Sequence, residues 1–220
     1  MLPRKRYSAS LKHCPQLADK AMASKIEKFE AIIDHLCDEL DRGNHFFQIA
    51  KALQRAYENN QLLDAPYFFA GTYDACLRES ILSLAKLTIA DKKSITIEYL
   101  LDTAFYTPTI FQPTTLEELS AVITQHRKHL GELRPLIESV REQRDRVIAH
   151  LDRKHINSPA LILSSSVNMT ELGQCFETLL RMVNLYRGYY NGSEFSFGLI
   201  ESGVQDDIDY LLTLMKSAYK

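Results

Sequence analysis

The chain has 220 residues, of which 45% are hydrophobic, and its 26 basic and 28 acidic side chains give a formal net charge of -2. This balance excludes the strong overall positive field of a typical high-affinity nucleic-acid-binding protein, so any RNA contact has to be local. The length suits one domain over residues 1–220. Within it we predict an N-terminal helical extension over about 1–60, a core over about 61–190 and a C-terminal helix over about 203–220.

Helical periodicity dominates the chain from one end to the other. Apolar residues spaced by three and four predict a first helix from Leu17 to Asp41, and the pair Gly43–Asn44 is expected to end it. A shorter helix is predicted from Phe46 to Tyr57, where Asn59–Asn60 breaks the pattern.

A long third helix is predicted next, because apolar spacing holds from Phe69 to Thr88, with Pro66 just before it. Asp74 and Arg78, four residues apart, are expected to pair on its outer face. A short fourth helix is predicted over 94–101, and the two prolines between 106 and 113 indicate a loop.

The clearest helix start lies at Thr114–Thr115, where two overlapping capping boxes use Glu117 and Glu118. The fifth helix that follows is expected to bury Leu116, Leu119, Ile123 and Leu130. Arg134–Pro135 then predicts a new start or a kink, and the next helix is expected to run to about Arg153.

Two further helices are predicted in the last third of the chain. The first begins near Asn168, ends near Gly192 and is expected to bury Leu172, Phe176, Leu179, Val183 and Tyr186. The last follows a Gly/Ser-rich turn over 191–203 and is expected to bury Val204, Ile208, Leu211 and Met215. The apolar run 160–163 fits a strand or a buried connector. The pattern as a whole predicts an all-α bundle of about six to eight helices.

The cysteines and the first residues bear on where the protein acts. Cys37, Cys76 and Cys175 lie in apolar helical contexts, and neither they nor Cys14 has the close spacing of a zinc or redox pair. Buried thiols in a reducing cytoplasm are therefore favoured. The basic segment 1–6 leads into no apolar signal region, and no apolar run reaches the roughly 18 residues that a membrane span needs. We predict a cytoplasmic protein with no membrane partner.

The most informative segment reads Arg-Asp-Arg-Val-Ile-Ala-His, from Arg144 to His150. Arg144 falls on the apolar stripe formed by Leu133, Ile137, Val140, Val147 and Leu151. An unpaired buried guanidinium costs several kcal/mol, so Arg144 is a candidate functional residue. The alternative is structural: Arg144 pairs with a buried acid such as Asp74 or Glu79, and His150 stabilises a helix end.

The string from Gln143 to Asp152 resembles the signature of the HEPN superfamily, and most of all the branch named after abortive-infection protein U. That branch favours Arg-Asp-basic-x-x-Ala-His-x-Asp, which this sequence matches, and the segment 73–87 resembles its upstream helix. The resemblance covers roughly residues 60–190. It implies an all-α homodimer that cleaves RNA without a metal or other cofactor, in phage defence or a toxin–antitoxin system. A cognate antitoxin or neighbouring defence protein would be a further partner.

The residues of the string suit that chemistry. Cleavage by the ribose 2′-OH needs an acceptor for the hydroxyl proton, a donor for the departing 5′-oxygen and a cation for the phosphorane. We assign proton transfer to His150, charge stabilisation to Arg144 and an orienting role to Asp145. The runner-up function is a non-catalytic helical module that dimerises or binds a partner protein.

Helix geometry favours a site shared between two chains. Six residues turn a regular helix through about 600°, which leaves Arg144 and His150 about 120° apart. Two-fold pairing would bring Arg144 of one chain toward His150 of the other. Within one chain Arg146 is the better partner, since it lies four residues before His150 on the same face.

Other side chains offer weaker signals. Arg141, Arg146, Arg153 and Lys154 concentrate positive charge near the motif and are candidate RNA-binding residues, although alternating charges also mark an exposed helix. The pair His126 and His129 has a spacing that can hold zinc, but no third ligand lies nearby, so a partly buried or surface pair is favoured. The aromatic groups at 67–69 and 186–190 suit either base stacking or a core, and the core is favoured.

Overall fold

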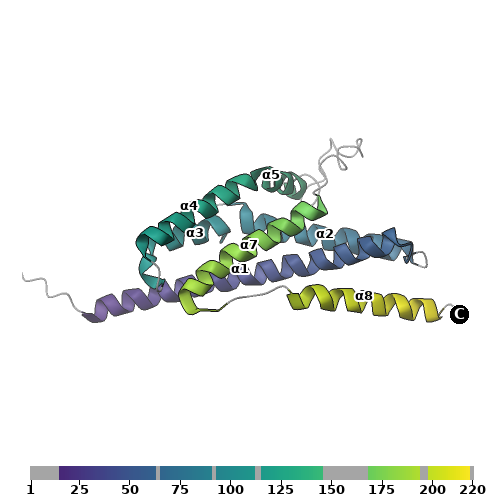
Figure 1. The fold of residues 1–220 in the computed structure, drawn as a ribbon, viewed down its shortest axis with the longest axis horizontal. Helices are drawn as coiled ribbons and strands as arrows, with labels where there is room; N and C mark the ends of the chain where they lie inside the picture. Colours follow the sequence, from purple (N-terminus) through teal and green to yellow (C-terminus); the bar gives the residue numbers. More distant parts are fainter. Residues whose placement is uncertain are drawn as a thin grey trace, which may run out of the picture.

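A computed structural model of the chain describes residues 15–62, 65–90, 93–111, 115–145, 168–193 and 198–218. Over these ranges the chain forms seven α-helices and one 3-10 helix with no strand, which confirms the all-α prediction (Figure 1). The elements are α1 Pro15–Glu58, α2 Pro66–Thr88, α3 Ile97–Tyr106, η1 Pro108–Ile110, α4 Leu116–Glu132, α5 Arg134–Gln143, α7 Met169–Asn191 and α8 Gly198–Ala218. The run 160–163 lies outside the described residues.

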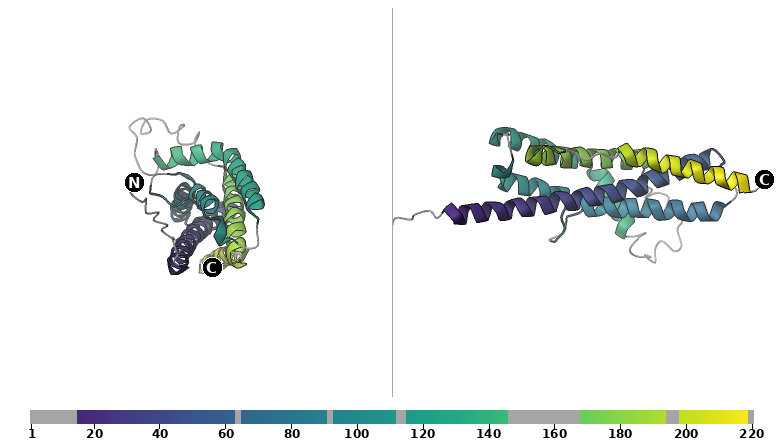
Figure 2. Two further views of the ribbon diagram at one scale, coloured as in Figure 1. Left: turned by 90° about the vertical axis from the view of Figure 1, so that its left-hand side faces the viewer. Right: turned by 90° about the horizontal axis from the view of Figure 1, so that it is seen from below.

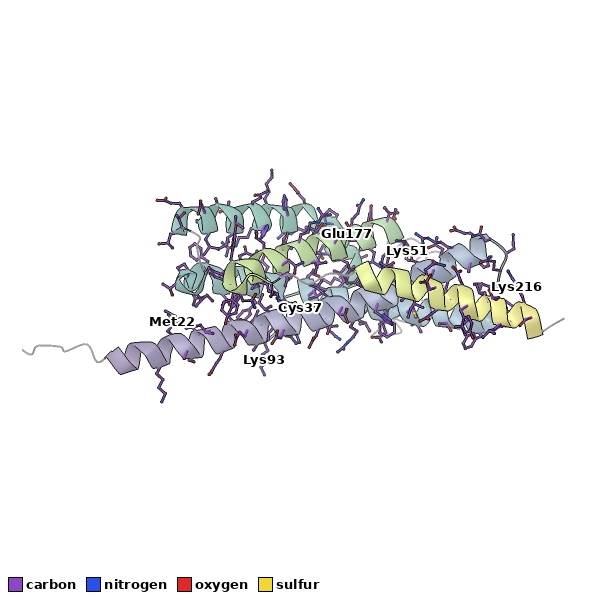
Figure 3. All side chains as sticks on the ribbon, turned by 60° about the horizontal axis from the view of Figure 1, so that its bottom comes forward. Met22, Cys37, Lys51, Lys93, Glu177 and Lys216 are labelled. Carbon is purple, nitrogen blue, oxygen red and sulfur yellow. The ribbon has the colours of Figure 1, made fainter. Side chains whose placement is uncertain are left out.

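Helix α1 is the longest helix that the structure describes, with 44 residues. It extends along most of the longest dimension, and Figure 3 labels Met22, Cys37 and Lys51 successively along it. Its largest contact is with α2, and it also packs against α3, α7 and α8. The predicted end of a helix at Gly43–Asn44 is therefore wrong, because one helix of 44 residues continues through both.

The reason for Gly43 is close packing rather than helix termination. A Cβ added there would lie 2.7 Å from Cε1 of Phe176 in α7 and 2.7 Å from Cβ of Ser83 in α2. The next residue of α1, Asn44, is also buried, and its Oδ1 accepts a hydrogen bond of 3.2 Å from Gln48 Nε2. Gly43 therefore marks a point where α1, α2 and α7 pack closely together.

Several predicted boundaries are confirmed. Helix α1 ends just before Asn59, and Asn60 takes a left-handed conformation with φ 56°. Thr115 forms the capping box with Glu118: Glu118 N donates to Thr115 Oγ1 at 3.2 Å, and Thr115 N donates to Glu118 Oε2 at 2.9 Å. Thr114 lies outside the described residues. Helix α3 starts later than predicted, because Thr96 caps it by accepting a hydrogen bond from Tyr99 N.

The core divides into a large and a small cluster. In the large one, α7 buries all five residues predicted for its inner face: Leu172, Phe176, Leu179, Val183 and Tyr186. In the small one, α8 packs Val204, Ile208 and Leu212 against α1 and α2. Leu211 was expected inside and is 54% exposed, because the buried face of α8 follows a spacing of four at each step. Leu116 is likewise exposed, since the buried face of α4 begins at Leu119.

Helices α4 and α5 form one edge of the molecule. Figures 1 and 2 place α5 on the opposite side from α8. A new helix begins at Arg134, as the Arg134–Pro135 pair predicted. Only Val140 and Gln143 of α5 are buried, so this helix contributes little to the core and presents mostly polar side chains. No helix within the described ranges has the length and apolar character to cross a membrane.

Candidate functional site

The described part of the motif lies at the end of α5. Arg144 is the C-cap residue of this helix and keeps a helical backbone, with φ -56° and ψ -51°. Residues 144 and 145 lie in a π-helical turn, in which the helix widens locally. Such turns occur often at functional sites because they displace side chains from the regular register.

The Arg144 guanidinium is held by the carboxylate of its neighbour. Arg144 Nε donates a hydrogen bond of 2.7 Å to Asp145 Oδ1, and Arg144 Nη2 lies 2.7 Å from the same oxygen. The two side chains are 32% and 49% exposed. A pair this exposed adds little stability, typically about 0–1 kcal/mol. Its main effect is to fix the plane of the guanidinium.

This arrangement leaves donors for an anion. A guanidinium has five N–H groups, and the carboxylate uses the edge formed by Nε and Nη2. The edge formed by Nη1 and Nη2 has the fork geometry that matches two phosphoryl oxygens. Arg144 is therefore oriented and within reach of solvent.

Arg144 is less buried than the stripe predicted. Val140, one turn earlier, is fully buried, whereas Leu133 and Ile137 are only half-buried. The two acids considered as internal partners are not its partners: the acid beside Arg144 is Asp145, and Asp74 forms an ion pair with Arg78 at 2.8 Å. The outward pairing of Asp74 with Arg78 was predicted and is confirmed.

The remaining motif residues divide between the two parts of the chain. Arg141 is described: it is exposed on α5, and its Nη1 lies 3.9 Å from Glu138 Oε2. His150, Arg146, Arg153 and Lys154 all lie outside the described residues. The structure thus brings together Arg141, Arg144 and Asp145 at one end of α5.

His126 and His129 form a half-buried pair on α4, as favoured. Their ring centroids are 6.3 Å apart, and His126 Nδ1 lies 3.1 Å from the hydroxyl of Tyr186. Burial lowers the pKa of His126, and the charge of His129 lowers it further. Across the described residues there is no group of three or more histidine, cysteine or acidic side chains that could hold a metal ion.

The cysteines and aromatic groups mostly belong to the core. Cys37, Cys76 and Cys175 are buried free thiols, and burial raises the pKa of Cys175 to about 12. Phe69 and Tyr186 are buried, which confirms the core interpretation for them. Tyr67 and the adjacent Phe68 are instead exposed at the start of α2.

A polar cleft beside α5 was missed by the sequence analysis. Its volume is about 230 Å³, and it lies where α5 meets α4, the end of α2 and the start of α3. Its charged lining consists of Arg127, Arg134, Arg141, Glu98 and Glu138. Arg134, Glu138 and Arg141 recur at spacings of four and three, a signal that could have grouped the α5 residues on one helix face. The contributions of α3 and α4 depend on the fold.

Comparison with known proteins bears on most of the chain. The model of the HEPN family AbiU2 matches residues 26–211, which include most of α1 and α8 as well as the segment that carried the resemblance. No curated protein and no solved structure matches the chain significantly. Since the match spans well over half of the sequence, this all-α chain belongs to the HEPN family AbiU2.

Proposed function

We propose that this protein is a metal-independent endoribonuclease that cleaves RNA by attack of the ribose 2′-OH, in phage defence or a toxin–antitoxin system. One observation supports this proposal most: within the HEPN motif the Arg144 guanidinium is oriented by Asp145 and remains one-third exposed. A cation held in this way can stabilise charge that develops on a phosphorane without first having to reorganise.

Each motif residue has a separate role in the proposed reaction. His150 accepts the proton of the attacking 2′-OH and returns one to the departing 5′-oxygen, since an imidazole titrates near neutral pH. Arg144 donates hydrogen bonds to the non-bridging phosphoryl oxygens. Asp145 positions Arg144 through the 2.7 Å contact.

The active form is proposed to be a homodimer in which Arg144 of one subunit acts with His150 of the other. Arg141, Arg146, Arg153 and Lys154 are proposed to contact the RNA backbone, because a local basic region can attract phosphates although the net charge is -2.

A non-catalytic interaction module is the second candidate. One observation favours it: α8 exposes three large apolar side chains, Tyr210, Leu211 and Leu214. Exposed apolar residues on one helix suit a protein interface. In this alternative the motif helix would dimerise without cleaving RNA.

Cleavage of labelled RNA in excess chelator tests the proposal. The wild type should cleave, and His150→Ala should fold and be inactive. Arg144→Gln should lose about 10²–10³-fold in kcat, the usual effect of removing one donor to transition-state charge. Arg181→Gln is the matched control, because Arg181 is an exposed arginine of α7 that pairs with Glu177 at 3.0 Å. If the wild type leaves RNA intact while it forms dimers, the interaction module is the better description.

Mixing two inactive variants tests whether the site is shared. A mixed dimer of Arg144→Gln and His150→Ala retains one intact pair if Arg144 acts with His150 of the other subunit. Random pairing would then restore about a quarter of wild-type activity, since half of the dimers are mixed and each has one of two sites. If each site lies within one chain, the mixture stays inactive.

A further inference from the structure

The polar cleft beside α5 extends the candidate site along this helix, from Arg144 back toward Arg134. Arg134, Glu138 and Arg141 line the cleft from α5, and Arg144 and Asp145 follow Arg141 by three and four residues, where the helix widens into the π-helical turn. The cleft therefore lies on the helix face that leads to the motif. From Arg134 to Arg144 is about 15 Å along the helix at 1.5 Å per residue.

The arginines reach the cleft from two helices. Arg134 and Arg141 belong to α5, whereas Arg127 belongs to α4. Arg127 is held in place, because its Nη2 lies 2.6 Å from Asp102 Oδ1 and its guanidinium carbon lies 5.8 Å from the centre of the Phe105 ring. Cations are thus present on two walls of the cleft.

Two of the three arginines already have acidic partners, Arg127 with Asp102 at 2.6 Å and Arg141 with Glu138 at 3.9 Å. The contact of Arg141 is loose, and Glu98 lies in the first turn of α3, where the helix dipole stabilises a carboxylate. Among the residues that the structure describes, Arg134 forms no ion pair. Arg134 is therefore the cation of the cleft that is most available to a ligand.

We propose that this cleft is a phosphate-binding subsite for the RNA strand, with Arg134 as its principal contact and Arg127 and Arg141 beside it. The inference rests on the proposed function and deepens it: the strand whose scissile phosphate is at Arg144 continues along α5 into the cleft. The subsite contacts phosphate and reads no base.

Salt-dependent binding separates a phosphate contact from other effects. The probe is a fluorescein-labelled 2′-O-methyl RNA of about 15 nucleotides, which keeps its phosphates and lacks the attacking hydroxyl. Dissociation constants of the full-length protein are measured by anisotropy at salt concentrations from about 0.05 to about 0.3 M. Over roughly this range, counterion release changes the affinity strongly. Arg134→Gln should reduce the slope of log K against log salt by about 0.7. This reduction in slope corresponds to a Kd that is about fivefold weaker at 0.1 M salt, if the two proteins bind equally at about 1 M salt.

Two matched variants complete the test. Arg134→Lys keeps the charge and should keep the slope. Arg181→Gln removes an exposed arginine from α7, away from the cleft, and should leave slope and Kd unchanged. A single-stranded DNA probe of the same sequence should lose the same 0.7 with Arg134→Gln, because the contact is to phosphate.

The outcomes also separate this subsite from the nuclease proposal. If the wild type cleaves RNA but Arg134→Gln changes neither slope nor Kd, the subsite is refuted and the nuclease stands. If the slope falls as expected while the wild type cleaves no RNA, the cleft binds phosphate in a protein without nuclease activity. If the wild type binds neither probe, the subsite is refuted.

Discussion

The contact of α1, α2 and α7 differs sharply from the end of α5. At the three-helix contact Gly43 lies against Phe176 and Ser83, and the side chains of Phe176 and Leu84 are fully buried. Helix α5, in contrast, buries only Val140 and Gln143 and ends in the exposed pair of Arg144 and Asp145. Packing holds the first region together, whereas the second presents charge to solvent. Substitutions in the two regions should therefore have separate effects on stability and activity.

Gly43→Ala should give the largest effect and test the packed region. An alanine in a helix is usually favoured over glycine by about 1 kcal/mol. At Gly43 the added Cβ would lie 2.7 Å from two buried atoms, so the ring of Phe176 or helix α2 has to move. We expect a net loss of about 1–3 kcal/mol in the free energy of unfolding, measured by urea denaturation.

Gly71→Ala is the matched control, because Gly71 is exposed in α2 and a Cβ there would meet nothing within 4 Å. It should stabilise the protein by about 0.5–1 kcal/mol. In a Phe176→Leu background the cost of Gly43→Ala should shrink, since the closest ring atoms are gone. Equal stabilisation by both alanine variants would contradict the close packing at Gly43.

Gly43 also shows where sequence reasoning reaches its limit. A glycine followed by asparagine is typical of a helix end, and the sequence contains no sign of the Phe176 ring that occupies the space beside Gly43. Local signals did better: the capping box at Thr115 and the apolar face of α7 were predicted because each depends on residues close in sequence. Features that depend on contacts between distant parts of the chain, such as the continuation of α1 through Gly43, could not be predicted in this way.

The same distinction applies to charged residues. Glu39 is only 5% exposed and bonds Lys86 of α2 at 3.0 Å, a contact between residues 47 positions apart that periodicity does not reveal. Arg144 and Asp145 could be singled out from their motif, but only the structure shows that the residue Asp145 orients is Arg144. The cleft combines the end of α2 with α3, α4 and α5, so the sequence indicates only the residues that α5 contributes.

Acidification should lower the free energy of unfolding by less than Gly43→Ala does, through the half-buried His126. Burial lowers the pKa of His126, so the folded state keeps this ring neutral over a range where the unfolded state protonates it. The unfolded state then binds more protons, and stability falls as the pH decreases from about 7 through the ordinary histidine pKa near 6.5. We expect a smaller loss than that of Gly43→Ala, because the ring is half-buried.

Denaturation at several pH values between about 5.5 and 7.5 measures this effect around the ordinary histidine pKa. His126→Gln should flatten the pH dependence and can keep a hydrogen bond to the Tyr186 hydroxyl, which His126 Nδ1 now contacts at 3.1 Å. His129→Gln should remove only the smaller, electrostatic part of the shift. An unchanged pH dependence in His126→Gln would show that other groups cause it.

Arg144→Gln should have the smallest effect on stability, and it decides between the two interpretations of the motif. The Arg144 side chain is 32% exposed, and its partner Asp145 is 49% exposed. Removing such a pair usually changes the free energy of unfolding by no more than about 0.5–1 kcal/mol. RNA cleavage, in contrast, should fall by orders of magnitude. A loss of more than about 3 kcal/mol, typical of a broken buried ion pair, would instead assign Arg144 to the core and favour the structural alternative.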